Sequence, residues 1–288
     1  MTLLRLSFML CAMLFGPSLS KAVSPKNIFI LAGQSNMAGR GGVEKNQSGE
    51  FVWDGLIPPN CRSSPSILRL NAARQWEEAR EPLHWDIDIN KTNGIGPGMG
   101  FAHQLLTKAG PSAGIVGLVP CAIGGTLITQ WMKNPCNPNA TFYQSLIERI
   151  EASDKEGGVV RALLWFQGES DAAMSDTAMS YKDNLKTFIT DLRNDIQPRF
   201  LPVIIVKIAL YDFFVKNDTH NLPAVRAAED AVSQELPDVL IIDSWKLPIN
   251  FTTYEGFNLD HGHFNTTIET IVGQWMADTY LSHYGQLL

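Results

Sequence analysis

The chain has 288 residues, 45% of them apolar and 18% charged, which is enough to bury the core of one domain or at most two. Its net charge of −6 and the lack of a basic block argue against a nucleic-acid partner. After the first 20 residues, no stretch reaches the ~18 apolar residues that a membrane helix needs. We therefore expect the mature protein to be soluble and not to associate with a membrane.

Residues 1–20 have the pattern of an export signal. Arg5 precedes an apolar run that is too short to span a bilayer, and small residues follow up to Ser20. We expect cleavage after Ser20, with Ala22 as another possible end. Removal of Arg5 with this leader takes the net charge from −6 to about −7.

Asn-x-Ser/Thr sequons support a secreted glycoprotein, which we expect outside the cell, for example in a cell wall. They begin at Asn46, Asn90, Asn139, Asn217, Asn250 and Asn265, and none has a central proline.

Five short runs of apolar and β-branched residues predict buried strands. They are continuous rather than alternating, as in strands that are covered on both faces. The predicted strands span 27–33, 114–121, 159–168, 201–210 and 238–244. Helix-like segments lie at about 98–109, 141–154, 176–196, 222–236 and 265–282. This alternation predicts a parallel sheet between two helix layers.

The stretch 43–97 is irregular and rich in Pro, Asn, Trp and Gly. We interpret it as a rim or lid over the sheet rather than as a second domain. Residues 21–288 are therefore expected to form a single domain.

Ser35 directly follows the first predicted strand, in the stretch Gly33–Met37. Ligands of open parallel sheets bind outside the carboxyl ends of the strands, so a serine here is well placed for chemistry. The hydrolase pattern G-x-S-x-G is not matched because Met37 takes the final position, and no phosphate-binding glycine motif occurs in this loop. On its own, Ser35 is also consistent with a helix N-cap.

Asp260 and His263 lie between the last strand and the last helix. An acid and an imidazole three residues apart can face the same way, so that the carboxylate holds one ring nitrogen while the other takes a proton from serine. His261 is adjacent to the acid and should diverge from it. The alternatives are an Asp260 helix cap with surface histidines, or a metal cluster; we expect no metal, because no third ligand stands at close spacing.

Two further loops offer donors for an oxyanion. Gly124 and Gly125 follow the second strand, and their backbone N–H groups can approach a ligand closely. Gln167 follows the third strand and offers a side-chain amide. Each loop alone is an ordinary strand-to-helix turn, but together they place donors near Ser35.

Cys61, Cys121 and Cys136 remain after removal of the leader, which also contains Cys11. This odd number allows at most one internal disulfide, and the sequence selects no pair. Buried free thiols are an equal alternative.

The motifs GQSNMAG, CAIGGT, WFQGESD and DHGH resemble those of the SGNH (GDSL-like) hydrolases, in the branch of sialate O-acetylesterase domains and plant carbohydrate esterases. The resemblance covers nearly all of the mature chain. It implies a flavodoxin-like, three-layer α/β/α fold with a mainly parallel five-stranded sheet, and a serine esterase without metal or cofactor. Ser35 would be the nucleophile, His263 the base and Asp260 the acid that orients it.

The same resemblance implies that the Ser35 amide, an amide of Gly124 or Gly125, and the Gln167 side chain hold the oxyanion. Gln34 replaces the Asp of the GDSL pattern, and Gln167 stands where Asn is usual.

Residues near these motifs are candidates for contacts with the substrate. They are Gln34, Asn36, Glu169 and Trp131. Aromatic side chains at the rim could provide flat surfaces for a sugar, with core packing as the alternative for each. These are Trp53, Trp76, His84 and Trp131.

We expect a monomeric enzyme that removes O-acetyl groups from a carbohydrate, such as a cell-wall polysaccharide. The alternatives are an esterase for lipids or other small acyl esters, and a non-catalytic carbohydrate-binding protein.

Overall fold

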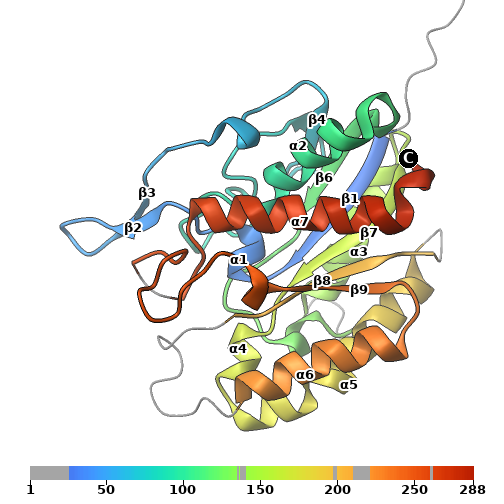
Figure 1. Cartoon of the computed structure of the whole chain (residues 1–288). Helices are drawn as coiled ribbons and strands as arrows, with labels where there is room; N and C mark the ends of the chain where they lie inside the picture. Colours follow the sequence, from blue (N-terminus) through green and yellow to red (C-terminus); the bar gives the residue numbers. More distant parts are fainter. Residues whose placement is uncertain (1–25, 135, 137–140, 197–199, 210–220, 260–261) are drawn as a thin grey trace, which may run out of the picture.

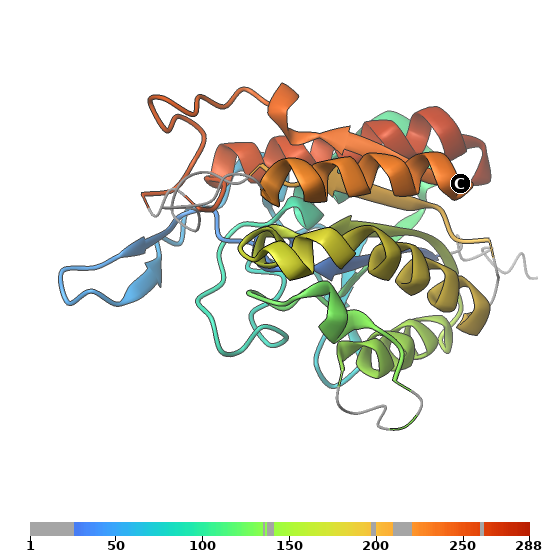
Figure 2. The same ribbon diagram turned by 90° about the horizontal axis from the view of Figure 1, so that it is seen from below.

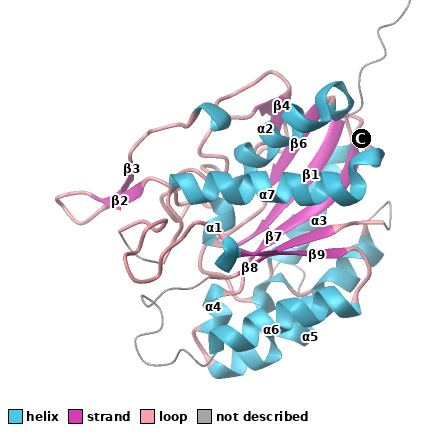
Figure 3. Cartoon of the chain, viewed as in Figure 1, coloured by secondary structure: helices cyan, strands magenta, loops and turns pink. Residues whose placement is uncertain are grey.

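A computed structural model describes residues 26–134, 136, 141–196, 200–209, 221–259 and 262–288 (Figure 1). Its centre is a seven-stranded sheet in the order β5-β4-β6-β1-β7-β8-β9. β2 (Val43–Lys45) and β3 (Phe51–Trp53) form a separate two-stranded sheet. Figure 3 shows helices on both sides of the large sheet.

The five strands predicted from the sequence are all parallel to one another and form the middle and one side of the sheet. They are β1 (Lys26–Gly33), β6 (Ile115–Pro120), β7 (Val159–Phe166), β8 (Val203–Lys207) and β9 (Val239–Asp243). β1 pairs with β6 on one side and with β7 on the other, which is the flavodoxin-like 2-1-3-4-5 order. The expected fold class is therefore confirmed, and β1 lies where the strand order reverses.

Two further strands come from the stretch that we expected to be only a rim. β4 (Ile67–Leu70) is parallel to β6, and β5 (Trp76–Glu78) is antiparallel to β4. The apolar run of β4 is short and interrupted by Arg69, which conceals it in the sequence. The guanidinium of Arg69 is buried between the carboxylates of Glu77 and Asp86, each at 2.7 Å.

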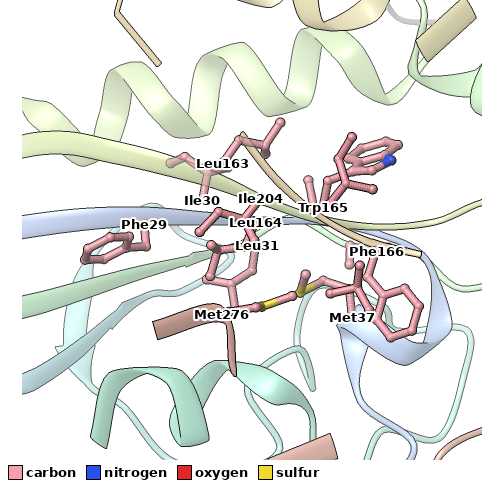
Figure 4. Packing of buried hydrophobic residues seen from close by; sticks show 14 of the residues in the cluster. Phe29, Ile30, Leu31, Met37, Leu163, Leu164, Trp165, Phe166, Ile204 and Met276 are labelled. Atoms are coloured by element: carbon pink, nitrogen blue, oxygen red, sulfur yellow. The ribbon is translucent and has the colours of Figure 1, made fainter. Parts of the chain in front are cut away.

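The helices form two layers. Phe166 of β7 packs its ring on Phe264, just before α7, whereas its neighbour Trp165 packs on Phe188 of α5. Successive strand residues point to opposite faces, so α5 and α7 cover opposite faces. Figure 4 shows Trp165 and Phe166 on opposite sides of the strand, with Met276 of α7 on the Phe166 side.

α2 packs against α7, and the other long helices cover the second face (Figure 2). The bounds of the long helices are α2 (Pro97–Ala109), α3 (Phe142–Asp154), α5 (Ser175–Asp195), α6 (Asn221–Glu235) and α7 (Thr266–Tyr284). They match the five helical segments predicted from the sequence. Two short helices, α1 (Ser35–Ala38) and α4 (Glu169–Ala172), start just after β1 and β7.

Cys61 and Cys121 are buried free thiols and Cys136 is an exposed one, so the disulfide alternative is not realised. Among the described residues, no helix is both long and apolar enough to cross a membrane.

Gly33 brings the ends of β1 and β7 into close contact. Its φ of +135° is a conformation that side-chain-bearing residues rarely adopt, and the next amide, of Gln34, donates to the Phe166 carbonyl at 2.9 Å. A Cβ at position 33 would lie 2.1 Å from that carbonyl oxygen. Glycine is therefore required at the point from which the chain turns into Ser35.

We expect Gly33→Ala to lower the free energy of unfolding by about 3 kcal/mol or more, because backbone strain and a backbone clash add. Gly157→Ala is the matched control: Gly157 also has a positive φ, of +80°, but has open space around its Cβ position. This control should cost only about 1–2 kcal/mol. Urea denaturation measures both, and equal losses would contradict the clash.

Candidate active site

A cavity of about 700 Å³ opens beyond the carboxyl ends of the central strands. Its floor comes from the turns after β1, β6 and β7 and from the loop before α7; the floor residues are Gln34, Ser35, Arg40, Gly124, Gly125, Glu169, Ser170, Gly262 and His263. An outer wall comes from the β2–β3 hairpin and from residues 90–92. The predicted functional edge of the sheet thus carries a cavity.

Ser35 and His263 meet in this cavity. Ser35 is the first residue of α1 and is 7% exposed. Its Oγ lies 3.0 Å from Nε2 of His263, although the two residues are 228 positions apart in the chain. A neutral imidazole at this distance can accept the serine proton. Asp260 and His261 lie outside the described residues.

Asn36 holds the loop of His263 over the serine. Its Oδ1 accepts the amide N–H of Phe264 at 3.2 Å, and its Nδ2 donates to Oε1 of Glu169 at 2.7 Å. The amide of Asn258 donates to the carbonyl of His263 at 2.9 Å and closes the loop. Both ends of the Asn36 side chain are therefore engaged within the protein.

Gln167 does not face the cavity. It is fully buried, and its Nε2 donates to the Thr126 carbonyl at 2.8 Å and to Oδ2 of Asp171 at 2.6 Å. The hydroxyl of Tyr181 donates to its Oε1 at 3.0 Å. These bonds use both amide hydrogens, so the side chain braces the turn instead of taking the oxyanion role that the sequence suggested.

Gln34 links the turns after β1 and β7. Its Oε1 accepts from the amides of Gly168 and Ser170, each at 3.3 Å, and lies at the same distance from Nε2 of Gln167, whose two hydrogens make shorter bonds elsewhere. Since Gln34 also lines the cavity, it joins the serine turn to the buried brace beneath it.

Gly124 and Gly125 both line the cavity beside Ser35. A Cβ on Gly124 would lie 2.5 Å from Nη2 of Arg40, and Gly125 has a φ of +78°. Each position therefore favours glycine, and both remain candidates for an oxyanion donor.

The expected contact of Trp131 with a substrate is wrong. Trp131 is fully buried: its Nε1 donates to Oγ1 of Thr126, and its ring packs edge-on against Trp165. His84 is buried too, and burial lowers its pKa to about 3. Trp53 and Trp76 are partly buried against the core. In the described part of the chain, these four side chains are not among the cavity-lining residues.

Two buried carboxyl groups lie in and beneath the cavity floor. Burial raises the pKa of Glu169, while the hydrogen bond from Asn36 and the charge of His263 lower it. Burial likewise raises the pKa of Asp171 to about 6, against the hydrogen bonds of Gln167 and Ile128. Arg40, in the cavity floor, is neutralised by Asp88, with Nη2 2.5 Å from Oδ2. No group of three or more potential metal ligands occurs within the described ranges.

A serine after the first strand and a histidine before the last helix meet on a flavodoxin-like sheet, an arrangement that resembles that of the SGNH-type hydrolases. Residues 25–282 match the family model described as carbohydrate esterase, sialic acid-specific acetylesterase. The chain belongs to this family, and it is a carbohydrate esterase, that is, a carboxylic ester hydrolase.

A relative described as a probable carbohydrate esterase of Arabidopsis thaliana is 39% identical over 269 residues, covering 93% of this chain and 95% of that protein. The crystal structure of the Arabidopsis protein superposes with a TM-score of 0.79 over 90% of this chain and 99% of that one. NanS is similar in fold at 16% identity, with a TM-score of 0.68 and coverage of 91% and 98%. A carbohydrate acetylesterase from Xanthomonas citri has 18% identity, a TM-score of 0.61 and coverage of 91% and 57%.

The raised pKa of Asp171 makes a specific contribution to the pH dependence of stability. An unfolded Asp titrates near ~3.9, so between that pH and about 6 the native state binds a proton that the unfolded state has released. Stability from this group is therefore present at acid pH and is lost as the pH rises through this window.

We expect the unfolding free energy of the wild type, relative to that of Asp171→Asn, to fall by about 2 kcal/mol between about pH 4.5 and about pH 7. Urea denaturation of both proteins at the two pH values measures this difference, and the buried acids that both share cancel. Parallel pH profiles would contradict the assignment.

Proposed function

We propose that this esterase removes O-acetyl groups from a glycan, such as a cell-wall polysaccharide, through Ser35, His263 and Asp260. The observation that carries the proposal is the 3.0 Å contact between Oγ of Ser35 and Nε2 of His263 in the floor of the cavity. The membership of the chain in a carbohydrate esterase family supports the choice of substrate.

In this mechanism, Nε2 of His263 accepts the hydroxyl proton of Ser35 while Oγ attacks the acetyl carbonyl carbon. Asp260 orients the imidazole and stabilises its charged form. His263 then gives the proton to the sugar oxygen as the ester C–O bond breaks, which leaves acetyl-Ser35. A water molecule, deprotonated by His263, attacks this second ester, and acetate leaves as the Ser35 hydroxyl is restored.

The oxyanion is held by the Ser35 amide and by an amide of Gly124 or Gly125. Ser35 begins a helix, where the first N–H groups have no intrahelical acceptor, and both glycines line the same cavity. One well-aimed donor of this kind is worth about 3–4 kcal/mol of transition-state stabilisation. Gln167 contributes indirectly, by bracing the turns that carry these donors.

Gln34, Asn36 and Glu169 position the catalytic pair. Gln34 is held by donors from the turn after β7, and Asn36 is held between Glu169 and the backbone beside His263. We assign them this role because Oε1 of Gln34 and both ends of the Asn36 side chain are engaged within the protein, and the carboxylate of Glu169 is buried.

We also propose that residues 1–20 are an export signal, that the protein is secreted, and that a single domain extends from residue 21 onward. The family match begins at residue 25, just after this leader. N-terminal sequencing of the secreted protein should give Lys21 or Val23 as the first residue; retention of Met1 would contradict cleavage.

Ser35→Ala should lower kcat for p-nitrophenyl acetate by roughly 10⁴-fold or more, because no acetyl-enzyme can form. Its melting temperature should change little, since the hydroxyl lies at the cavity surface. Ser170→Ala is the matched control, because Ser170 lines the same cavity and its backbone amide bonds to Gln34. Activity retained in Ser35→Ala, or lost equally in Ser170→Ala, would refute the nucleophile.

A second pair of variants distinguishes the two acids near His263. Asp260→Asn should lower kcat by roughly 10⁴-fold, because the imidazole loses its orienting carboxylate. Glu169→Gln should cost roughly tenfold or less, since the new amide oxygen can still accept from Asn36. Steady-state kinetics of both variants measure these losses, and the reverse order would make Glu169 the acid of the triad.

A further inference from the structure

The β2–β3 hairpin forms the outer wall of the active-site cavity. β2 (Val43–Lys45) and β3 (Phe51–Trp53) are antiparallel, and the hairpin projects from the body of the protein (Figures 1 and 2). Val43, Lys45 and Phe51 line the same cavity as Ser35. The hairpin is thus part of the surface that a large substrate meets.

The base of this hairpin is firmly packed. Val43 is buried and Trp53 packs on the core, so closely to Gly94 that a Cβ there would lie within 3.0 Å of both side chains. The Asp54 amide donates to the Gly42 carbonyl at 2.9 Å. Oγ1 of Thr92 donates to the Phe51 carbonyl at 2.9 Å and ties the hairpin to the neighbouring wall. Phe51 is therefore held in place at the cavity mouth.

Phe51 exposes its aromatic ring to solvent at the cavity mouth, which is unfavourable for an apolar group. It is 48% exposed, and its cross-strand partner Lys45 has Nζ 5.1 Å from the ring centroid, which is a cation–π distance. Leu259, which also lines the cavity, is 74% exposed. Apolar groups left exposed around a cavity mark a binding surface, because they gain free energy when a ligand covers them.

The cavity is also larger than one acetyl ester requires. Its volume of about 700 Å³ falls within the ~300–1,000 Å³ of clefts that enclose drug-sized ligands. It therefore has room for a sugar ring beyond the one that carries the ester.

We propose that Phe51 and Lys45 form an outer sugar subsite, so that the enzyme acts on acetylated oligosaccharide chains in preference to monosaccharides. The apolar C–H face of a pyranose ring stacks on Phe51, while Lys45 donates hydrogen bonds to sugar oxygens. This inference rests on the proposed acetylesterase function and names the substrate class of the same site.

The test compares chain lengths in two series of probes, acetylated xylose against acetylated xylotetraose and acetylated galacturonic acid against its acetylated tetramer. In at least one series, wild-type kcat/KM should be tenfold or more higher for the tetramer. Phe51→Ala should lower kcat/KM for that tetramer by about tenfold, mainly through KM, and leave the monomer and p-nitrophenyl acetate unchanged. Phe51→Trp should retain the preference.

Val52→Ala is the matched control. Val52 is adjacent on the same strand and similarly exposed, at 42%, but it points to the other face of the hairpin and is not among the cavity-lining residues of the described chain. It should change no rate. The subsite would be overturned if the wild type showed no preference for the tetramer in either series, or hydrolysed no glycan at all. Equal effects of the Phe51 and Val52 changes would overturn it too. If the wild type did not hydrolyse p-nitrophenyl acetate, the proposed esterase chemistry itself would be refuted.

Discussion

The hydrogen bond between Ser35 and His263 is the interaction on which the arrangement of the cavity depends. It joins the turn after the first strand to the loop before the last helix. The glycine at position 33 allows the serine turn to lie against the end of β7. Asn36, next to the serine, accepts a hydrogen bond from the amide of Phe264 and so fixes the backbone next to His263. A serine and a histidine from distant parts of the chain are thus aligned by backbone contacts that a flavodoxin-like sheet brings together at one edge.

Buried polar groups that hydrogen-bond to each other support this alignment. Their burial carries a desolvation penalty. Gln34, Gln167 and Asp171 form a network under the serine turn, and a fully bonded network of this kind specifies a single geometry. The raised pKa of Asp171 measures the cost of keeping a carboxyl group there. Apolar side chains in the same place would avoid this desolvation penalty, but they would not orient the amides that line the cavity.

The sequence predicted the parts of the fold that depend on local pattern. Continuous apolar runs identify β1 and its parallel neighbours, since strands covered on both faces need no polar residue. β4 was missed because the charged Arg69 interrupts it, and only tertiary ion pairs make that charge tolerable. The orientations of Gln167 and Trp131 could not be predicted, because a residue just past a strand end can face the cavity or the layer beneath it. The orientation of Phe51 could not be predicted either, because a strand of three residues is too short for its alternation to show which side chains face the cavity.

Covalent trapping is the most direct test of Ser35 as a nucleophile that His263 activates. The protein, dialysed against EDTA, is treated with a serine-directed organophosphonate, and the modified residue is identified by peptide mass spectrometry. We expect rapid inactivation with one phosphonyl group on Ser35 in the wild type, far slower labelling in His263→Ala, and unchanged acetyl release after dialysis alone. Labelling of another serine, or activity that vanishes on chelation and returns with zinc, would contradict this role of Ser35.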